Sequence, residues 1–275
     1  MGWKKFIEKQ QTGQGGMMFM KFKFIRLEIK DDIGIVTVNR PPINAVNNEL
    51  HREMTHMFNS IINNNDELRV VIMRAEGKTF MAGNDLKELG ALNKETVVET
   101  RDTLKEAMNA VYYCRVPVIG AVNGAAVGGG LCYCACCDIL VAAEDAFFGL
   151  PEVKVAIVGA AAFLRQMVPK KVAYYMALTG QNISAQEMHK YGAVLKVVPL
   201  EELMDEAMKV AKILSAQPPL VQQDFKKAMH INEDARLGEK YDIEMSFTTH
   251  HLETEDFKEG ISAFFERRIP QFKGR

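Results

Sequence analysis

Two continuous apolar runs, each followed by a loop that contains glycine, most constrain the fold of this chain. Residues 70–73 (VVIM) and 116–122 (VPVIGAV) show no alternation of apolar and polar side chains. Such runs are typical of strands that are buried on both faces of a parallel sheet. A charged helix is expected between them, over residues 94–112, because parallel neighbours need a crossover connection. The chain is therefore predicted to have an α/β fold.

The rest of the chain extends this pattern. We expect a hairpin over residues 25–38, because residues 25–30 alternate and residues 35–38 are β-rich around a turn. Further elements are expected as strands at 139–142, 146–149 and 194–198, and as helices from Asn47, over 160–168, over 172–178 and over most of the chain after Glu201. These patterns predict an N-terminal extension (1–21), a core (22–215) and a helical C-terminal region (216–275).

Composition and charge exclude several classes of protein. The chain has 275 residues, and 34 Lys and Arg stand against 35 Asp and Glu, for a formal net charge of −1. That balance provides no field to draw the protein onto nucleic acid or anionic lipid. No apolar stretch reaches the roughly 18 residues of a membrane span, and the N-terminus lacks the apolar centre of a signal peptide. We expect a cytoplasmic protein with neither a nucleic-acid nor a membrane partner.

Two loops stand out because each ends a buried strand and opens a helix. They are residues 80–86 (FMAGNDL) and residues 124–130 (GAAVGGG). Helix N-termini present unpaired N–H groups, and glycine lets a ligand approach the backbone closely. Tight packing of helix on strand would explain either loop alone. Two such loops together favour an oxyanion hole, in which two N–H groups bind an oxygen that gains negative charge. The spacing fits neither a dinucleotide fingerprint nor a P-loop.

Five segments resemble one known family in order and spacing. They are PPINAV, GKTFMAGNDLKEL, the long run PVIGAVNGAAVGGGLCYCACCDILVAAEDAFFGLPEVKV, ALTG with its downstream YGAVLKVV, and TEDFKEGISAFFERRIPQF. On these residues the chain resembles the crotonase, or enoyl-CoA hydratase/isomerase, superfamily from about Phe22 to Arg275. The resemblance implies a spiral of ββα units with a helical C-terminal region, assembled as a homotrimer or homohexamer.

The resemblance also implies a substrate and a site. Members bind an acyl-CoA thioester and stabilise its enolate, and they need no cofactor besides the coenzyme A of the substrate. By position, the backbone N–H groups of Ala82 and Gly129 would form the oxyanion hole. Contacts with the substrate are expected from residues of the two loops and from a basic residue near the C-terminus: Met81, Asn84, Asp85, Leu86, Lys87, Gly128, Cys132 and Lys273. Asp85 is also expected to cap the helix that follows it.

The acid/base residues decide which reaction occurs. The hydratases of this family carry one Glu just after the triple glycine and another in an F-G-x-P-E segment. Here the second is Glu152, but Cys132 stands in place of the first. Two carboxylates suit the addition of water, whereas one suits the movement of a proton between two carbons. We therefore favour double-bond isomerisation with Glu152 as the acid/base. Hydration, decarboxylation, C–C bond cleavage, thioester hydrolysis, and a non-catalytic acyl-CoA-binding or RNA-binding role are the alternatives.

The cysteines and histidines suggest less. Four of the five cysteines are clustered, at Cys132, Cys134, Cys136 and Cys137. An odd total of five cysteines does not indicate a disulfide framework. On a helix these four side chains do not converge, so no metal site is expected. We interpret Cys132 as a small buried residue rather than a nucleophile. Five of the six histidines are expected on solvated helix faces, with His250 or His251 as the one that approaches the site.

Overall fold

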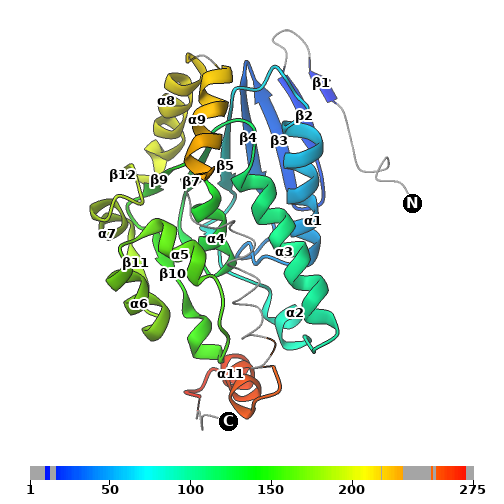
Figure 1. Cartoon of the computed structure of the whole chain (residues 1–275), viewed down its shortest axis with the longest axis vertical. Helices are drawn as coiled ribbons and strands as arrows, with labels where there is room; N and C mark the ends of the chain where they lie inside the picture. Colours follow the sequence, from blue (N-terminus) through cyan, green and yellow to red (C-terminus); the bar gives the residue numbers. More distant parts are fainter. Residues whose placement is uncertain (1–9, 13–16, 218, 232–248, 250–251, 271–275) are drawn as a thin grey trace.

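Alternating apolar side chains form the first hairpin of the large sheet. The computed structural model describes residues 10–12, 17–217, 219–231, 249 and 252–270 (Figure 1). In it, β3 (Ile25–Lys30) pairs antiparallel with β4 (Ile33–Val38). The inward-facing side chains of Ile25, Leu27 and Ile29 are buried while their neighbours are partly exposed. The predicted hairpin is confirmed.

The large sheet continues N-terminally beyond this hairpin. β2 (Met17–Lys21) pairs antiparallel with β3, and β1 (Gln10–Thr12) pairs with β2. The folded region thus begins before Phe22, which we took as its first residue. The short run of residues 17–21 carries no alternating pattern, but the open edge of β3 gives its backbone N–H and C=O groups partners.

Parallel strands make up the rest of the eight-stranded sheet, whose order is β1-β2-β3-β4-β5-β7-β9-β12. From β4 onward every neighbour is parallel: β5 (Val70–Ala75), β7 (Val118–Val122), β9 (Ile139–Ala143) and β12 (Lys196–Val198). Nearly all side chains of β5, β7 and β9 are buried, as expected for strands covered on both faces. The predicted parallel α/β arrangement is confirmed.

A second, four-stranded sheet is built from short strands, in the order β11-β10-β8-β6. β6 (Thr79–Met81), β8 (Ala125–Val127) and β10 (Phe147–Gly149) are parallel, and β11 (Ile183–Ser184) is antiparallel to β10. The pairs β5–β6, β7–β8 and β9–β10 each give one strand to each sheet and then lead into a helix. This repetition is the expected ββα unit.

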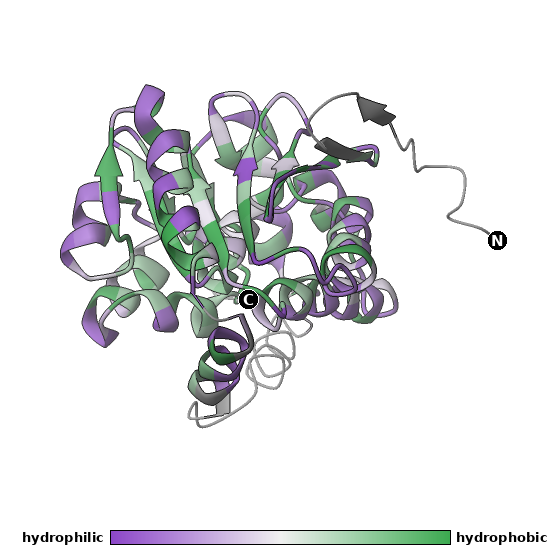
Figure 2. Ribbon diagram, turned by 90° about the horizontal axis from the view of Figure 1, so that it is seen from above, coloured by the Kyte–Doolittle hydropathy of each residue, from purple (hydrophilic) through white to green (hydrophobic). Residues whose placement is uncertain are grey.

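Helices cover these sheets and fill the C-terminal part of the described chain. They are α1 (Asn48–His56) with its π-helical continuation η2 (Met57–Ile62), α2 (Leu86–Gly90), α3 (Thr96–Tyr112), α4 (Gly129–Cys136), α5 (Ala161–Met167), α6 (Lys170–Thr179), α7 (Ala185–Lys190), α8 (Leu203–Ser215), α9 (Pro219–Ile231) and α11 (Glu255–Glu266), with the 3₁₀ helices η3 (Pro151–Val155) and η4 (Leu200–Glu202). Helix α8 packs against β5, β7 and β9, and α3 packs against α1 and α4. Figure 2 shows apolar strands enclosed by helices whose outer faces are polar. Within the described ranges, no helix combines the length and apolarity that crossing a bilayer requires.

The short sheet determines where the site is formed. β6, β8 and β10 are parallel neighbours, so their carboxyl ends lie at one edge. Residues 82–85 follow β6, Gly128 follows β8, and residues 150–152 follow β10. Ligands of α/β folds bind beyond the carboxyl ends of parallel strands, and all three of these segments contain residues predicted for the site or directly adjoin them.

Candidate active site

The loop after β6 is held by the chain segment of residues 43–46. The N–H of Ala82 donates to the carbonyl of Ile43 at 3.2 Å, and the N–H of Asp85 donates to the carbonyl of Val46 at 2.7 Å. The N–H of Val46 donates to the carbonyl of Gly83 at 2.7 Å. Backbone N–H groups alternate in direction along an extended segment, so the N–H of Asn84 faces the opposite side.

This pairing corrects the predicted oxyanion hole. The N–H of Ala82 already has an acceptor, and the prediction that it forms the hole is wrong. The backbone N of Asn84 lies 3.8 Å from the position of a Cβ built on Gly129. In the described part of the chain, neither the N–H of Asn84 nor that of Gly129 donates to a protein acceptor. The two donors that lie close together therefore belong to Asn84 and Gly129.

Each glycine of the triple-glycine turn has a different neighbour. Gly128 has a left-handed φ of 51°, and a Cβ there would lie 2.7 Å from Oε1 of Glu152. A Cβ on Gly129 would lie 2.6 Å from Oδ1 of Asn84, and one on Gly130 would overlap the carbonyl oxygen of Met81. The turn thus admits the carboxylate of Glu152 and the amide of Asn84 because it has no side chains of its own.

Glu152 enters the site from η3, directly after β10. The N–H of Gly128 donates to the carbonyl of Gly149 at 2.9 Å, which joins the end of β10 to the glycine turn. The N–H of Ile157 donates to the backbone carbonyl of Glu152 at 3.0 Å and closes the η3 turn. These bonds fix the backbone that carries the Glu152 carboxylate.

Two adjoining cavities meet at these residues. The larger has a volume of about 860 Å³ and runs between the loops after β6 and β8, η3 and the end of α11. The smaller has a volume of about 60 Å³ and lies between α1, α2, α3 and the segment after η3. Both share part of their walls: Asn84, Asp85, Leu89, Glu152 and Ile157. Asn84 and Glu152 therefore lie where the two cavities adjoin.

Asp85 has a structural role at this junction. Its Oδ1 accepts from the N–H of Lys87 at 3.0 Å and caps α2, as predicted, while its Oδ2 accepts from Nη2 of Arg40 at 2.6 Å. Burial alone would raise the pKa of Asp85, but the Arg40 and Lys87 hydrogen bonds hold that pKa below its ordinary value. Asp85 is thus an ionised carboxylate that orders the loop, and it is not suited to carry a proton.

The other residues predicted to contact substrate lie in different places. Leu86, Lys87 and Gly128 line the larger cavity. Met81 and Cys132 line neither cavity: Met81 is fully buried in the core, and Cys132 is only 2% exposed. Both side chains are buried by the packing of α4 on β6, which contradicts the prediction that they contact the substrate. Lys273, His250 and His251 lie outside the described residues.

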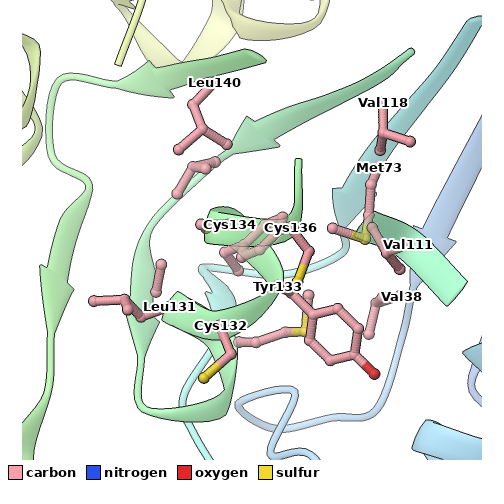
Figure 3. Close-up of a cluster of buried hydrophobic side chains, with 14 of the residues drawn as sticks. Val38, Met73, Val111, Val118, Leu131, Cys132, Tyr133, Cys134, Cys136 and Leu140 are labelled. Carbon is pink, nitrogen blue, oxygen red and sulfur yellow. The ribbon is translucent and has the colours of Figure 1, made fainter. Parts of the chain in front are cut away.

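The cysteine cluster belongs to the core. Figure 3 shows Cys132, Cys134 and Cys136 on α4 among apolar side chains of the neighbouring strands. Burial raises the pKa of the Cys134 and Cys136 thiols well above its usual range. Among the described residues, three or more His, Cys, Asp or Glu side chains nowhere gather closely enough to hold a metal ion.

Several residues that line the cavities were not predicted from the sequence, among them His51, Arg40 and Lys154. His51 on α1 is 2% exposed and lines the smaller cavity, so the expectation of a solvated helix face is wrong for it. The spacing of His51, Met54 and Phe58 on one helix face could have indicated its burial. Arg40 and Lys154 line the larger cavity. Lys154 lies within the FGLPEVKV segment and Arg40 directly precedes PPINAV, but neither was assigned a role in the site.

Comparison with known proteins identifies the family. A sequence model described as enoyl-CoA hydratase/isomerase matches residues 28–275. The chain belongs to the enoyl-CoA hydratase/isomerase family. Of two similar family members, the first is the (7aS)-7a-methyl-1,5-dioxo-2,3,5,6,7,7a-hexahydro-1H-indene-carboxyl-CoA hydrolase of Rhodococcus jostii, 37% identical over 79% of this chain and 84% of that protein. The second is a probable mitochondrial enoyl-CoA hydratase of Dictyostelium discoideum, 34% identical over 94% of this chain and 93% of that protein.

Solved structures of enoyl-CoA hydratase/isomerase family members share the fold. The crystal structure of an enoyl-CoA hydratase from Mycobacterium avium subsp. paratuberculosis superposes with a TM-score of 0.82 at 26% sequence identity. The superposition covers 92% of this chain and 100% of the M. avium chain. The chain is thus an enzyme of the enoyl-CoA hydratase/isomerase family, and the resemblance inferred from its motifs is confirmed.

Proposed function

We propose that this enzyme acts on an acyl-CoA thioester bound across the two cavities. The main observation in support is that Asn84 and Glu152 lie in the walls of both cavities, at their junction. The coenzyme A arm would occupy the larger cavity and the acyl group the smaller one. Lys87 and Lys154 in the larger cavity make no ion pair with the described residues and would meet the phosphates.

The thioester oxygen would bind to the N–H groups of Asn84 and Gly129. When a proton leaves the carbon next to the thioester carbonyl, negative charge moves onto this oxygen. Donors that are already oriented by the backbone stabilise that charge without reorganising. The pairing of residues 82–85 with residues 43–46 supports this role, because it fixes the direction of the Asn84 N–H.

Glu152 would move the proton between two carbons of the acyl chain, which is a double-bond isomerisation. Two other carboxylates in the smaller cavity have structural partners. Asp85 accepts from Arg40, and Glu88 accepts from the N–H of Asn48 at 2.9 Å. Cys132, in place of the first glutamate of the hydratases, is buried away from both cavities. A site with one acid/base favours isomerisation over the addition of water.

Addition of water is the second candidate, and one observation favours it. Oδ1 of Asn84 is buried beside the glycine turn and accepts no hydrogen bond from the described residues. It could orient a water molecule that Glu152 activates. The names of the relatives, hydratase and hydrolase, also point to reactions with water.

Product analysis with two substrates of matched length tests both candidates. The purified enzyme is supplied separately with crotonyl-CoA and with 3-butenoyl-CoA, alongside the Glu152→Gln variant. We expect rapid conversion of the 3-enoyl thioester, little hydration, and loss of turnover in Glu152→Gln with acyl-CoA binding retained. Glu144→Gln, an exposed turn residue, is the matched control and should act like the wild type. Rapid hydration of crotonyl-CoA would establish the second candidate, and a fully active Glu152→Gln would overturn both.

A further inference from the structure

His51 and Tyr133 form an isolated polar pair beside the smaller cavity. Nδ1 of His51 lies 2.9 Å from the hydroxyl of Tyr133, and the two rings are stacked with centroids 5.8 Å apart. Both side chains are buried, yet His51 lines the cavity. Figure 3 shows the Tyr133 ring among Val38, Met73 and Val111, which offer its hydroxyl no polar partner.

This isolation determines which nitrogen of His51 carries the proton. The Tyr133 hydroxyl has no other hydrogen-bond partner in the described ranges, and a buried O–H that donates to nothing is costly. It therefore donates to Nδ1 of His51, and the proton of the neutral imidazole resides on Nε2. Burial lowers the pKa of His51 to about 3, so the ring is neutral at physiological pH. The Nε2–H in turn has no acceptor among the described residues.

The charges around the cavity favour a neutral ligand group. Three acidic side chains line it, Asp85, Glu88 and Glu152, and its one basic residue, Arg101, is paired with Asp102 at 2.8 Å. A carboxylate on the acyl group would be repelled by these acidic groups. A carbonyl oxygen carries no net charge and accepts one hydrogen bond from an N–H donor.

We infer that the Nε2–H of His51 donates a hydrogen bond to a carbonyl oxygen on the acyl chain, so that the preferred substrates are oxoacyl-CoA thioesters. Tyr133 is a positioning residue, because it holds the imidazole in the tautomer that donates into the cavity. The inference rests on the proposed function, since it takes the smaller cavity as the acyl site. An acyl chain without this oxygen would leave the buried Nε2–H of His51 without an acceptor. A site with such an unpaired donor binds that acyl chain less tightly.

Binding measurements test this inference independently of turnover. The dissociation constants of hexanoyl-CoA and of its 4-oxo and 5-oxo analogues are measured by calorimetry for the wild type, His51→Leu and Tyr133→Phe. We expect the wild type to bind one oxo analogue roughly 10- to 100-fold more tightly than hexanoyl-CoA. His51→Leu should lose that preference while it binds hexanoyl-CoA about as well as the wild type. His56→Leu, on the same helix but outside the cavity wall, is the matched control and should retain the preference.

A spectroscopic readout separates positioning from a purely structural role. The ¹⁵N shifts of His51 should report the Nε2–H tautomer in the wild type and a mixture of tautomers in Tyr133→Phe, together with a smaller oxo preference. Equal binding of the oxo and plain thioesters by the wild type, or an unchanged preference in His51→Leu, overturns the inference but leaves the proposed function intact. Failure of all the acyl-CoA compounds to bind overturns the proposed function, and the inference with it.

Discussion

Oε1 of Glu152 lies 2.7 Å from the position that a Cβ on Gly128 would occupy. The carboxylate therefore lies against bare backbone at the start of α4, and the absence of a side chain at Gly128 sets its position. The same glycine directly follows β8, so the position of the Glu152 carboxylate depends on a residue of a different ββα unit.

Replacement of this glycine should displace the carboxylate. We expect Gly128→Ala to lower kcat/KM about 100-fold, because misplacement of a catalytic group by about 1 Å has an effect of this size. The left-handed φ of 51° adds a loss of about 1–2 kcal/mol in the free energy of unfolding. Gly77→Ala is the matched control: Gly77 has a φ of 78°, and its Cβ would have no neighbour within 4 Å. It should lose similar stability and keep its activity. Equal activity in both variants would contradict the role of Gly128.

Asn84 contributes a backbone donor and a side-chain acceptor that can be separated. Asn84→Ala keeps the N–H and removes the buried Oδ1, which has no donor among the described residues. We expect kcat/KM for isomerisation to change less than about tenfold. The free energy of unfolding should stay constant or rise by about 1 kcal/mol, because an unpaired acceptor is removed. Steady-state kinetics and urea unfolding measure the two effects. A 1,000-fold loss of isomerisation would mean that the amide itself takes part.

Cys132 is predicted to have no catalytic role. It is buried and lines neither cavity, so Cys132→Ala should change kcat/KM less than about tenfold while lowering stability by about 1 kcal/mol. Thiol labelling provides a second measurement. Cys114, Cys132, Cys134 and Cys136 are buried, and we expect them to react slowly in the native protein and rapidly in denaturant. Rapid native labelling of Cys132 would contradict this account.

The buried imidazole of His51 makes stability depend on pH. Its pKa is about 3 in the folded protein, against about 6.5 in the unfolded chain. Between these values the unfolded state binds a proton that the folded state does not, so stability falls as the pH drops below about 6.5. The loss is about 1.4 kcal/mol per pH unit, and it is complete below the folded pKa.

Denaturant unfolding across a pH series checks this dependence. Comparison with His51→Leu cancels the other titrating groups. From pH 7 to pH 4.5, the wild type should lose about 3 kcal/mol more than the variant, since 4.5 lies 2 units below 6.5. If the unfolding free energies of the two proteins change in parallel with pH, the pKa of His51 is the same in the folded and unfolded states, which would contradict this prediction.

The sequence allowed us to predict long and strongly patterned elements, but not single-residue register. The hairpin β3–β4 and strands β5, β7 and β9 followed from alternating or continuous apolar runs, whereas the ββα repetition was implied by the resemblance to a known family. Strands β6 and β8 were not predicted, because each has only three residues and lies within or beside one of the glycine-containing loops. Ala82 and Asn84 show the same limit. They are two positions apart in the sequence. Only the hydrogen bonds between residues 82–85 and residues 43–46 show which of the two N–H groups has no acceptor among the described residues.

The burial of single side chains could not be predicted from the sequence either. His51 looked like one more polar residue of an amphipathic helix, and its partner Tyr133 lies 82 residues away in the chain. Met81 lies within the FMAGNDL segment of the site loop, yet its side chain is buried in the core. Motifs identify the loops that carry the chemistry, but packing decides which side chains of those loops reach a ligand. Assembly into trimers or hexamers stays a prediction.

The short sheet has a consequence for how the chemistry can change. In the proposed function, the loops after β6, β8 and β10 carry one thioester-oxygen donor, the other donor and the proton carrier, each from its own ββα unit. His51, which we infer to recognise the acyl chain, comes from a fourth place, α1. Acyl selection by α1 could therefore change by mutation without disturbing these loops, whereas thioester anchoring and proton transfer are coupled through the close approach of Glu152 to Gly128. A substitution on α1 would then change the preferred substrate while the three loops retain the thioester-binding role that we propose for them.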